Sequence, residues 1–208
     1  SGAGLSKRSG ALSIASLRDD GVEALAVAAV AVLTGSSDEV HAVGSLVELA
    51  QMFDLAHVSR NAAKFDPAEL RTLTQRTLLR LDFESVRERL AAHDIVGAHA
   101  EAFWLAVRGN LDQFLDVCDW WRVVDGEIAP VIEDADFCRT AAGLLPPDPW
   151  DEKTWSLWTQ AVKTATGRKG RELFHPLRLA LTGRETGPEL AKLLPLIGRA
   201  KSLSRLGA

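Results

Sequence analysis

Residues 167–206 have the sequence GRKGRELFHPLRLALTGRETGPELAKLLPLIGRAKSLSRL. Leucines at helical spacing are interrupted here by glycines and prolines, a pattern that predicts several short helices separated by breaks. One predicted helix covers residues 171–174, a second covers residues 177–181, and two more follow the turn. The predicted breaks are at His175-Pro176, Thr182-Gly183, Gly187-Pro188 and near Gly198. Glycine suits such ends because it takes positive φ without a Cβ clash.

The charge of the chain is strongly uneven. From Lys153 to the end there are eleven Lys and Arg against three Asp and Glu, so this region carries +8. Of the 24 basic and 28 acidic residues in the whole chain, the first 152 residues therefore hold 13 and 25, or −12. A cationic helical tail on an acidic body indicates a polyanionic partner.

Residues 169–190, KGRELFHPLRLALTGRETGPEL, closely resemble the C-terminal anticodon-binding region of bacterial glutamyl-tRNA synthetases, which are class I enzymes. The Pro-Leu-Arg-x-Ala-Leu-Thr-Gly run, the Gly/Pro turn and a following Leu-Leu-x-Leu-Ile-Gly carry the resemblance. It implies that the chain recognises the anticodon arm of tRNA. The whole enzyme of this family glutamylates tRNA-Glu with glutamate and ATP (with Mg), and whether tRNA-Gln is also accepted stays open.

The opening segment contains Leu5-Ser6-Lys7-Arg8 among glycines and serines. By itself it is a flexible basic loop at a frayed terminus. It also resembles the second half of the Lys-Met-Ser-Lys-Ser signature loop of class I synthetases, although Gly4 stands where that signature has its first lysine. The resemblance implies that Ser6, Lys7 and Arg8 bind ATP, with the Lys7 ammonium steadying the phosphates.

The features of the family's catalytic half are missing from the sequence. None of the five histidines forms a His-Ile-Gly-His signature, and no Val/Ile-rich strands alternate with helices as in a Rossmann-like sheet. We therefore expect this chain to be the C-terminal half of such an enzyme, inactive alone and without a catalytic residue. We expect it to bind no metal and no cofactor by itself, and to meet glutamate and ATP only in the full enzyme.

Compartment and partners follow from simpler features. Cys118 and Cys138 have neither metal-ligand spacing nor a disulfide framework and are expected to be reduced thiols. The apolar run from Val22 to Leu33 is too short to span a membrane. We expect a monomeric cytoplasmic protein with no membrane and no DNA partner.

The predicted fold is all-α without a Rossmann domain, namely a helical stem-contact segment followed by an anticodon-binding helical bundle in two subdomains. Helix starts are predicted at Ser45, where Glu48 completes a capping box, at Pro67 after the cap Asp66, and at Asp151. Further helices are expected over residues 22–34, 98–107, 111–121 and 135–145. The predicted domains are residues 1–60 (signature loop and stem contact), 61–147 and 148–208 (anticodon-binding subdomains 1 and 2).

Three residues are candidates for contacts with anticodon bases. The resemblance assigns this role to Arg178 of Pro-Leu-Arg, to Leu190 after the Gly/Pro turn, and to an arginine near Arg108. The alternatives are an ordinary salt bridge from Arg178 to Glu172 or Glu185, and core packing of Leu190. Base contacts are chemically reasonable because proteins read single-stranded RNA loops by splaying bases onto apolar or guanidinium surfaces and bonding their edges.

Other charged and aromatic residues have plainer interpretations. Arg168, Lys169 and Arg171 beside the family-like segment are candidates for tRNA backbone phosphates, with an ordinary charged surface as the alternative. Trp155 and Trp158, at i and i+3, are expected in the core, as is Trp120. Asp112, Asp116 and Asp119 are expected to share a solvated helix face.

Two rival functions remain. A helical protein-interaction scaffold could dock an acidic partner on the basic C-terminal face. A DNA-binding helical module is less favoured because no stretch has the pattern of a helix-turn-helix with a basic recognition helix.

Overall fold

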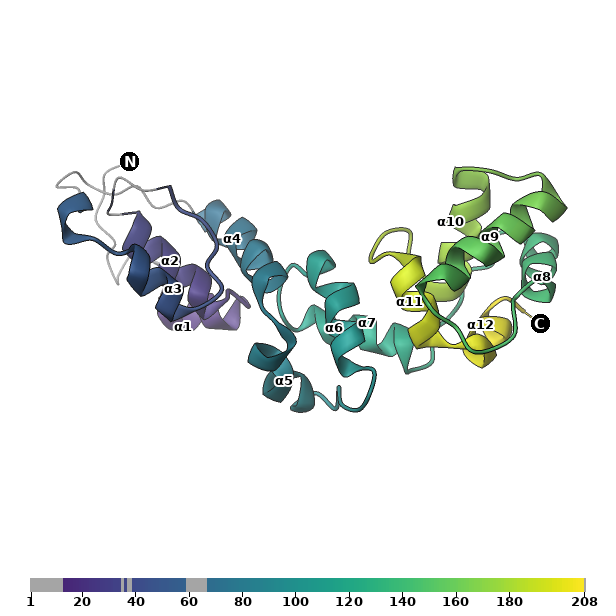
Figure 1. The fold of residues 1–208 in the computed structure, drawn as a ribbon, viewed down its shortest axis with the longest axis horizontal. Coiled ribbons are helices and arrows are strands. Elements are labelled where there is room, and N and C mark those ends of the chain that lie inside the picture. The colour runs from purple at the N-terminus through teal and green to yellow at the C-terminus, as the bar shows by residue number, and fades with distance from the viewer. Residues whose placement is uncertain (1–12, 35, 37–38, 59–66, 208) are drawn as a thin grey trace. The chain divides into compact units, whose positions relative to one another are not determined.

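The computed structural model of the 208-residue chain describes residues 13–34, 36, 39–58 and 67–207. Over these residues the chain is helical, with no strand beyond one isolated antiparallel bridge between Ser36 and Val58 (Figure 1). The predicted all-α fold is therefore confirmed for the described part. The signature loop of Ser6, Lys7 and Arg8 and the predicted cap Asp66 lie outside the described residues.

The chain divides into two compact units. Residues 1–87 and 108–116 form the first unit, and residues 88–107 and 117–208 form the second. The functional domains expected at residues 1–60, 61–147 and 148–208 are not tested by this division and stay a prediction.

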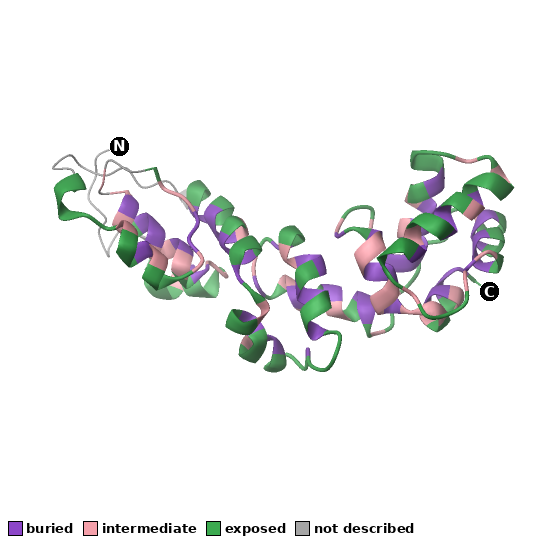
Figure 2. Cartoon of the chain, in the orientation of Figure 1, coloured by how far each residue is buried: buried purple, intermediate pink, exposed green. Residues whose placement is uncertain are grey.

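The first unit contains α1 (Ile14–Asp19), α2 (Ala24–Leu33), α3 (Leu46–Met52), η2 (Leu55–His57), α4 (Pro67–Arg80), the start of α5 (Phe83–Ala91) and η3 (Arg108–Asn110). Helix α2 packs against α3 and α4. Buried residues of α2, α3 and α4 contribute to this core (Figure 2). The small Ala26 and Ala29 allow close approach of the helices, and Leu33, Leu49 and Leu73 are among the larger buried side chains. The acidic first turn and basic last turn of α4 and α5 suit the helix dipole.

The second unit contains α6 (Ala100–Val107), α7 (Asp116–Val124), α8 (Ala135–Gly143), α9 (Glu152–Thr166), α10 (Arg171–Thr182), α11 (Leu190–Ile197) and α12 (Arg199–Arg205). Helix α9 packs against α8, α10 and α11, so that the C-terminal helices share one core. Trp158, within this core, is 1% exposed and donates its indole N–H to the Ala141 carbonyl at 2.8 Å. The predicted core role of Trp158 is confirmed, and Trp155 is half-buried beside it.

Local capping signals explain several helix starts. Asp151 caps α9 by accepting the Thr154 N–H at 3.1 Å, while the Thr154 hydroxyl accepts the Asp151 N–H at 2.9 Å. Ser45 accepts the Glu48 N–H at 3.1 Å as predicted. The second hydrogen bond of the predicted capping box, from the Ser45 N–H to the Glu48 side chain, is wrong. The Glu48 carboxylate accepts the Gly44 N–H at 2.7 Å, one residue before the cap.

Helix α10 runs unbroken from Arg171 to Thr182, so the predicted break at His175-Pro176 is wrong. An interior proline costs about 3 kcal/mol because one backbone hydrogen bond is lost and the ring crowds the preceding turn. Against that, Leu173, Leu177 and Leu181 are all buried on one stripe of α10, and each contributes about 1.5–3 kcal/mol. Burial therefore outweighs the proline. The predicted helix end at Gly183, whose backbone is in the left-handed region, is confirmed. The predicted break between the last two helices at Gly198 is confirmed as well.

The helix predicted over residues 111–121 begins five residues later, at Asp116. The Asp116 carboxylate accepts the N–H groups of Asp112 and Gln113 at 2.9 and 3.0 Å, which closes a turn before the helix. Asp112 thus lies on this turn, and the prediction that it shares a helix face with Asp119 is wrong. The other expected helices are found, with ends within two residues of those predicted.

Candidate nucleic-acid interface

Arg178, the first candidate for base contact, projects from the C-terminal half of α10. Its Nη2 donates to the Pro188 carbonyl at 3.1 Å, while its Nη1 is buried and has no hydrogen-bond partner. The alternative of a salt bridge to Glu172 or Glu185 is wrong, because neither carboxylate pairs with this guanidinium. Burial lowers the pKa of Arg178. The group nevertheless stays charged at neutral pH, so it is a cation with an unused donor.

The turn between α10 and α11 supplies the partner of Arg178. It leaves α10 at Gly183 with φ +68° and passes through Gly187 with φ +143°, both positions that favour glycine. The buried Pro188 then presents its carbonyl to Arg178 before α11 begins. The predicted Gly187-Pro188 turn is thus confirmed.

Leu190, the second candidate, is the first residue of α11 and is 4% exposed. It belongs to the same core as Leu177, Leu194 and Trp158. Its surroundings favour the core interpretation, and its contact with a base stays a prediction.

A third group of residues, which no sequence pattern indicated as a site, joins this turn to α7. The Arg184 guanidinium lies 4.7 Å from the centroid of the Trp120 ring, and its Nη2 is 3.2 Å from Oδ2 of Asp119. Trp120 is 4% exposed, as expected of a core residue. No local signal could have paired Arg184 with Asp119, since a helix-spacing pattern reports only neighbours three or four residues apart.

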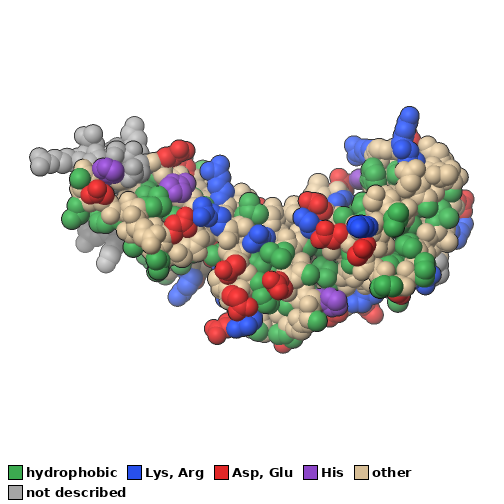
Figure 3. Space-filling view, in the orientation of Figure 1, with side chains coloured by type: hydrophobic (Ala, Val, Ile, Leu, Met, Phe, Trp, Pro, Cys, Tyr) green, Lys and Arg blue, Asp and Glu red, His purple; other side chains and the backbone are tan. Residues whose placement is uncertain are grey.

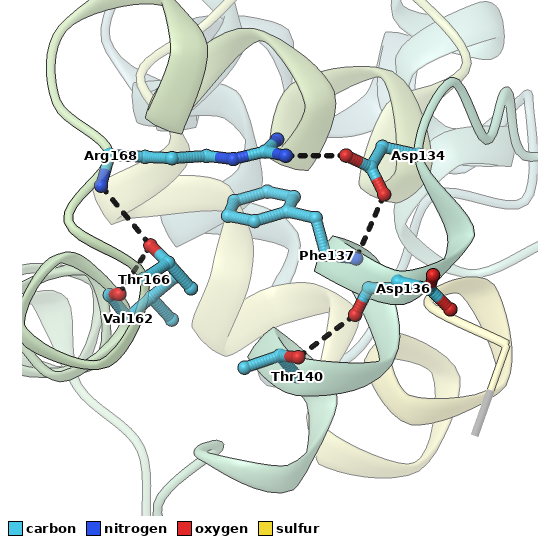
Figure 4. Close-up of polar contacts among 7 residues, drawn as sticks. All are labelled: Asp134, Asp136, Phe137, Thr140, Val162, Thr166 and Arg168. Carbon is cyan, nitrogen blue, oxygen red and sulfur yellow. Dashed lines mark hydrogen bonds and ion pairs between the residues drawn. The ribbon is translucent and has the colours of Figure 1, made fainter.

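Arg168, a candidate for phosphate contact, is held inside its own unit (Figure 4). Its guanidinium forms an ion pair with Asp134 and lies 4.2 Å from the centroid of the Phe137 ring. Asp134 in turn caps α8 by accepting the Phe137 N–H at 3.0 Å. That N–H and the Arg168 guanidinium hold the pKa of Asp134 below its ordinary value of 3.8. Arg168 thus ties the α9–α10 turn to α8.

The other basic residues of the C-terminal region fall into two groups. Several are engaged within the fold, as when Arg205 donates to the carbonyls of Leu181 and Gly126 at 2.9 and 3.1 Å. Among the described residues, the exposed cations of this region with no partner are Lys153, Lys163, Lys169 and Arg171. Basic and acidic side chains lie next to one another on the face of this unit seen in Figure 3. Three of these four cations, Lys163, Lys169 and Arg171, flank the α9–α10 turn, whereas Lys153 is near the start of α9.

The remaining base-contact candidate belongs to the other unit. Arg108 belongs to η3 of the first unit, where its Nη1 donates to the Leu81 carbonyl at 2.7 Å. Its role near the anticodon stays a prediction. In the part of the chain that the structure describes, no group of His, Cys, Asp and Glu could hold a metal ion, and Cys118 and Cys138 are free. No helix there is long and apolar enough to cross a membrane.

Comparison with known proteins gives consistent matches. The anticodon binding domain family matches residues 139–208. Glutamate–tRNA ligase 2 of Beijerinckia indica subsp. indica is 68% identical over 206 residues, which cover 99% of this chain and 46% of that protein. Glutamate–tRNA ligase 1 of Brucella canis is 56% identical with the same coverage of both proteins. The chain spans about half the length of the curated relatives it matches.

Solved structures share the fold at lower identity. A glutamate tRNA ligase from Elizabethkingia meningosepticum matches with a TM-score of 0.71 and 19% identity, covering 91% of this chain and 41% of that one. Glutamate-tRNA synthetase from Elizabethkingia anophelis matches with a TM-score of 0.70 and 18% identity, covering 97% and 43%. These likenesses agree with the all-α architecture described above.

Proposed function

We propose that this chain binds the anticodon arm of tRNA, because it belongs to the glutamate–tRNA ligase family. It spans about half the length of the family members that it matches. The observation that carries this proposal is Arg178. Its guanidinium is fixed on one side by the Pro188 carbonyl and keeps a buried, unsatisfied donor on the other. This donor is shielded from solvent in the free chain, so an acceptor on a base edge would reach it only after neighbouring groups move, and the bond would then recover the cost of about 1–3 kcal/mol of a buried donor without a partner.

Arg178 reads a base in this proposal, and the free cations position the RNA. Unpaired anticodon bases expose their edges, and the planar guanidinium fork offers several donors in fixed directions. Lys169 and Arg171 are exposed and unpaired, and they contact backbone phosphates. Phosphate contacts fix register and orientation but carry no sequence information. Affinity and base selection therefore depend on different residues of the same unit.

The activity of the whole enzyme is part of the proposal. Together with a catalytic half, the chain serves the ATP- and Mg-dependent transfer of glutamate to tRNA-Glu, in the cytoplasm and as a monomer. Ser6, Lys7 and Arg8 bind ATP in that assembly, with Lys7 at the phosphates. The chain by itself takes no cofactor.

Competition binding tests the proposal against a protein-interaction scaffold. Labelled tRNA-Glu bound to the 208-residue chain is challenged with unlabelled tRNA-Glu, with an anticodon-mutated tRNA-Glu, with duplex DNA and with polyglutamate. We expect tRNA-Glu to compete best and polyglutamate to compete little at equal charge. Equal displacement by polyglutamate would support a basic docking face for acidic proteins, and equal displacement by DNA would indicate a nonspecific polyanion surface.

A further inference from the structure

The turn that holds Arg178 has no regular secondary structure of its own. Residues 183–189 connect α10 to α11, and Glu185, Thr186 and Glu189 are exposed. The Arg184 N–H donates to the Thr182 hydroxyl at 3.2 Å and ties the beginning of the turn to α10, while the hydrogen bond from Arg178 to Pro188 joins its end to the same helix. The position of the Pro188 carbonyl therefore depends on contacts from outside the turn.

Gly187 provides one such contact, because its backbone touches the Trp120 ring. A Cβ at this position would lie 2.1 Å from one carbon of the indole and 2.6 Å from the next. Such distances are far inside van der Waals contact, so only glycine allows the backbone to approach the ring this closely. The turn is thus seated on Trp120 next to the proline that bonds Arg178.

Arg184 provides the second contact. It lies over the same Trp120 ring at 4.7 Å and pairs with Asp119, the neighbouring residue of α7, at 3.2 Å. A cation over an indole and an ion pair each contribute modestly at a partly exposed site. Here both act on one side chain, and together with Gly187 they attach the turn to α7 at two places.

We propose that Asp119, Trp120 and Arg184, called here the Arg184 clamp, position Arg178 for base selection. The inference rests on the proposed function. The clamp holds residues 183–189 in place, so that the Pro188 carbonyl keeps the Arg178 guanidinium in one orientation. An arginine without this partner could turn its donors to the edge of a different base. Loss of the clamp therefore lowers discrimination between bases more than it lowers overall affinity.

The experiment compares dissociation constants of the 208-residue chain for tRNA-Glu and for an anticodon-mutated tRNA-Glu. The ratio compared is the dissociation constant for the mutated tRNA divided by that for tRNA-Glu. For Arg184→Ala we expect this ratio to fall about threefold to tenfold, because the cation–ring contact and the ion pair are both lost. The melting temperature should change little, since Arg184 is 40% exposed. Trp120→Phe, which keeps a ring under the guanidinium, should retain more of the ratio than Trp120→Leu.

Two variants separate positioning from direct contact of Arg184 with RNA. Arg122 also pairs with Asp119 at 3.2 Å but belongs to α7 itself and not to the turn, so Arg122→Ala removes the same charge and should leave the ratio unchanged. Asp119→Asn should lower the ratio, as Arg184→Ala does. If Arg184 instead binds a phosphate directly, Asp119→Asn frees the guanidinium, tightens binding of both RNAs and leaves the ratio as it was, which overturns the clamp.

Arg178→Ala is measured in parallel so that the two hypotheses fail in different ways. If Arg178→Ala flattens the ratio and Arg184→Ala leaves it within twofold of the parent, only the clamp is overturned. If Arg178→Ala leaves the ratio unchanged, base reading by Arg178 fails, and the clamp fails with it.

Discussion

Arg178 carries the sharpest prediction at the scale of single residues. Arg178→Ala should cost about 1–3 kcal/mol in binding of tRNA-Glu and should flatten its advantage over an anticodon-mutated tRNA. The reason is that the Arg178 guanidinium is half-buried, bonds only the Pro188 carbonyl among the described residues, and keeps one N–H group without an acceptor. Arg178→Lys should recover little, because one ammonium cannot replace a planar fork. Equal binding of both tRNAs by parent and variant, measured by fluorescence polarisation, would contradict base reading.

Leu190 separates a core role from a base-facing one. It is 4% exposed within the core of the C-terminal helices, so Leu190→Ala should leave a cavity and lower the free energy of unfolding by about 2–5 kcal/mol. Leu157, 67% exposed on α9, is the matched control, and Leu157→Ala should stay within about 0.5 kcal/mol of the parent. Urea denaturation measures both. Unchanged stability of Leu190→Ala with weaker tRNA binding would instead place this leucine against a base.

At the scale of elements, the link between α8 and the α9–α10 turn is electrostatic and therefore depends on pH. The pKa of Asp134 is lowered in the folded chain by the Phe137 N–H and by Arg168. A carboxyl group with a lowered folded-state pKa stabilises the fold above its ordinary value of 3.8, and this stabilisation is lost as pH falls through the folded-state value.

Asp134→Asn should therefore melt at a lower temperature than the parent at neutral pH, and the difference should shrink as pH falls below about 3.8. Asparagine can still cap α8, so the charge is what the comparison isolates. Asp136→Asn, on the same helix and paired with the exposed Arg139, is the control and should change the melting temperature little at any pH. A constant difference between parent and Asp134→Asn across this range would rule out the charge effect.

At the scale of the whole molecule, the unpaired cations of the C-terminal region should control the salt dependence of tRNA binding. Each phosphate contact contributes a slope of roughly −0.7 to −0.9 in a plot of log affinity against log salt concentration. Lys169→Ala and Arg171→Ala should each make the slope shallower by about that amount and weaken cognate and mutated tRNA equally. Arg139→Ala removes the same charge from an ion pair on α8 and is the control. An unchanged slope in both test variants would place the phosphate contacts elsewhere.

A second prediction at this scale concerns catalysis by the 208-residue chain alone. The described residues contain no strand that could form a nucleotide-binding sheet. Glutamate-dependent ATP–pyrophosphate exchange by the chain should therefore not exceed a buffer blank. A full-length glutamate–tRNA ligase assayed alongside gives the positive control. Exchange clearly above the blank would show that the chain carries catalytic groups that neither its sequence pattern nor its helices reveal.

The sequence by itself determined the helical class, most helix ends and the family resemblance. These features are local. Asp151 starts α9 through a bond to Thr154, and Gly183 and Gly198 end helices through their own backbone angles. Interactions of this kind reach three or four residues along the chain, so their pattern is visible in the sequence.

Only the tertiary structure decided which of the candidate residues are available to contact RNA and which are engaged within the fold. Leu190 is buried in the core of the C-terminal helices. Arg168 forms an ion pair with Asp134, which caps α8, and Arg184 forms one with Asp119 of α7. The continuity of α10 across Pro176 was decided in the same way, because the core buries the leucines on both sides of the proline. Packing energy and ion pairs between distant segments depend on which helices meet in space, and the spacing of residues within one helix does not record that.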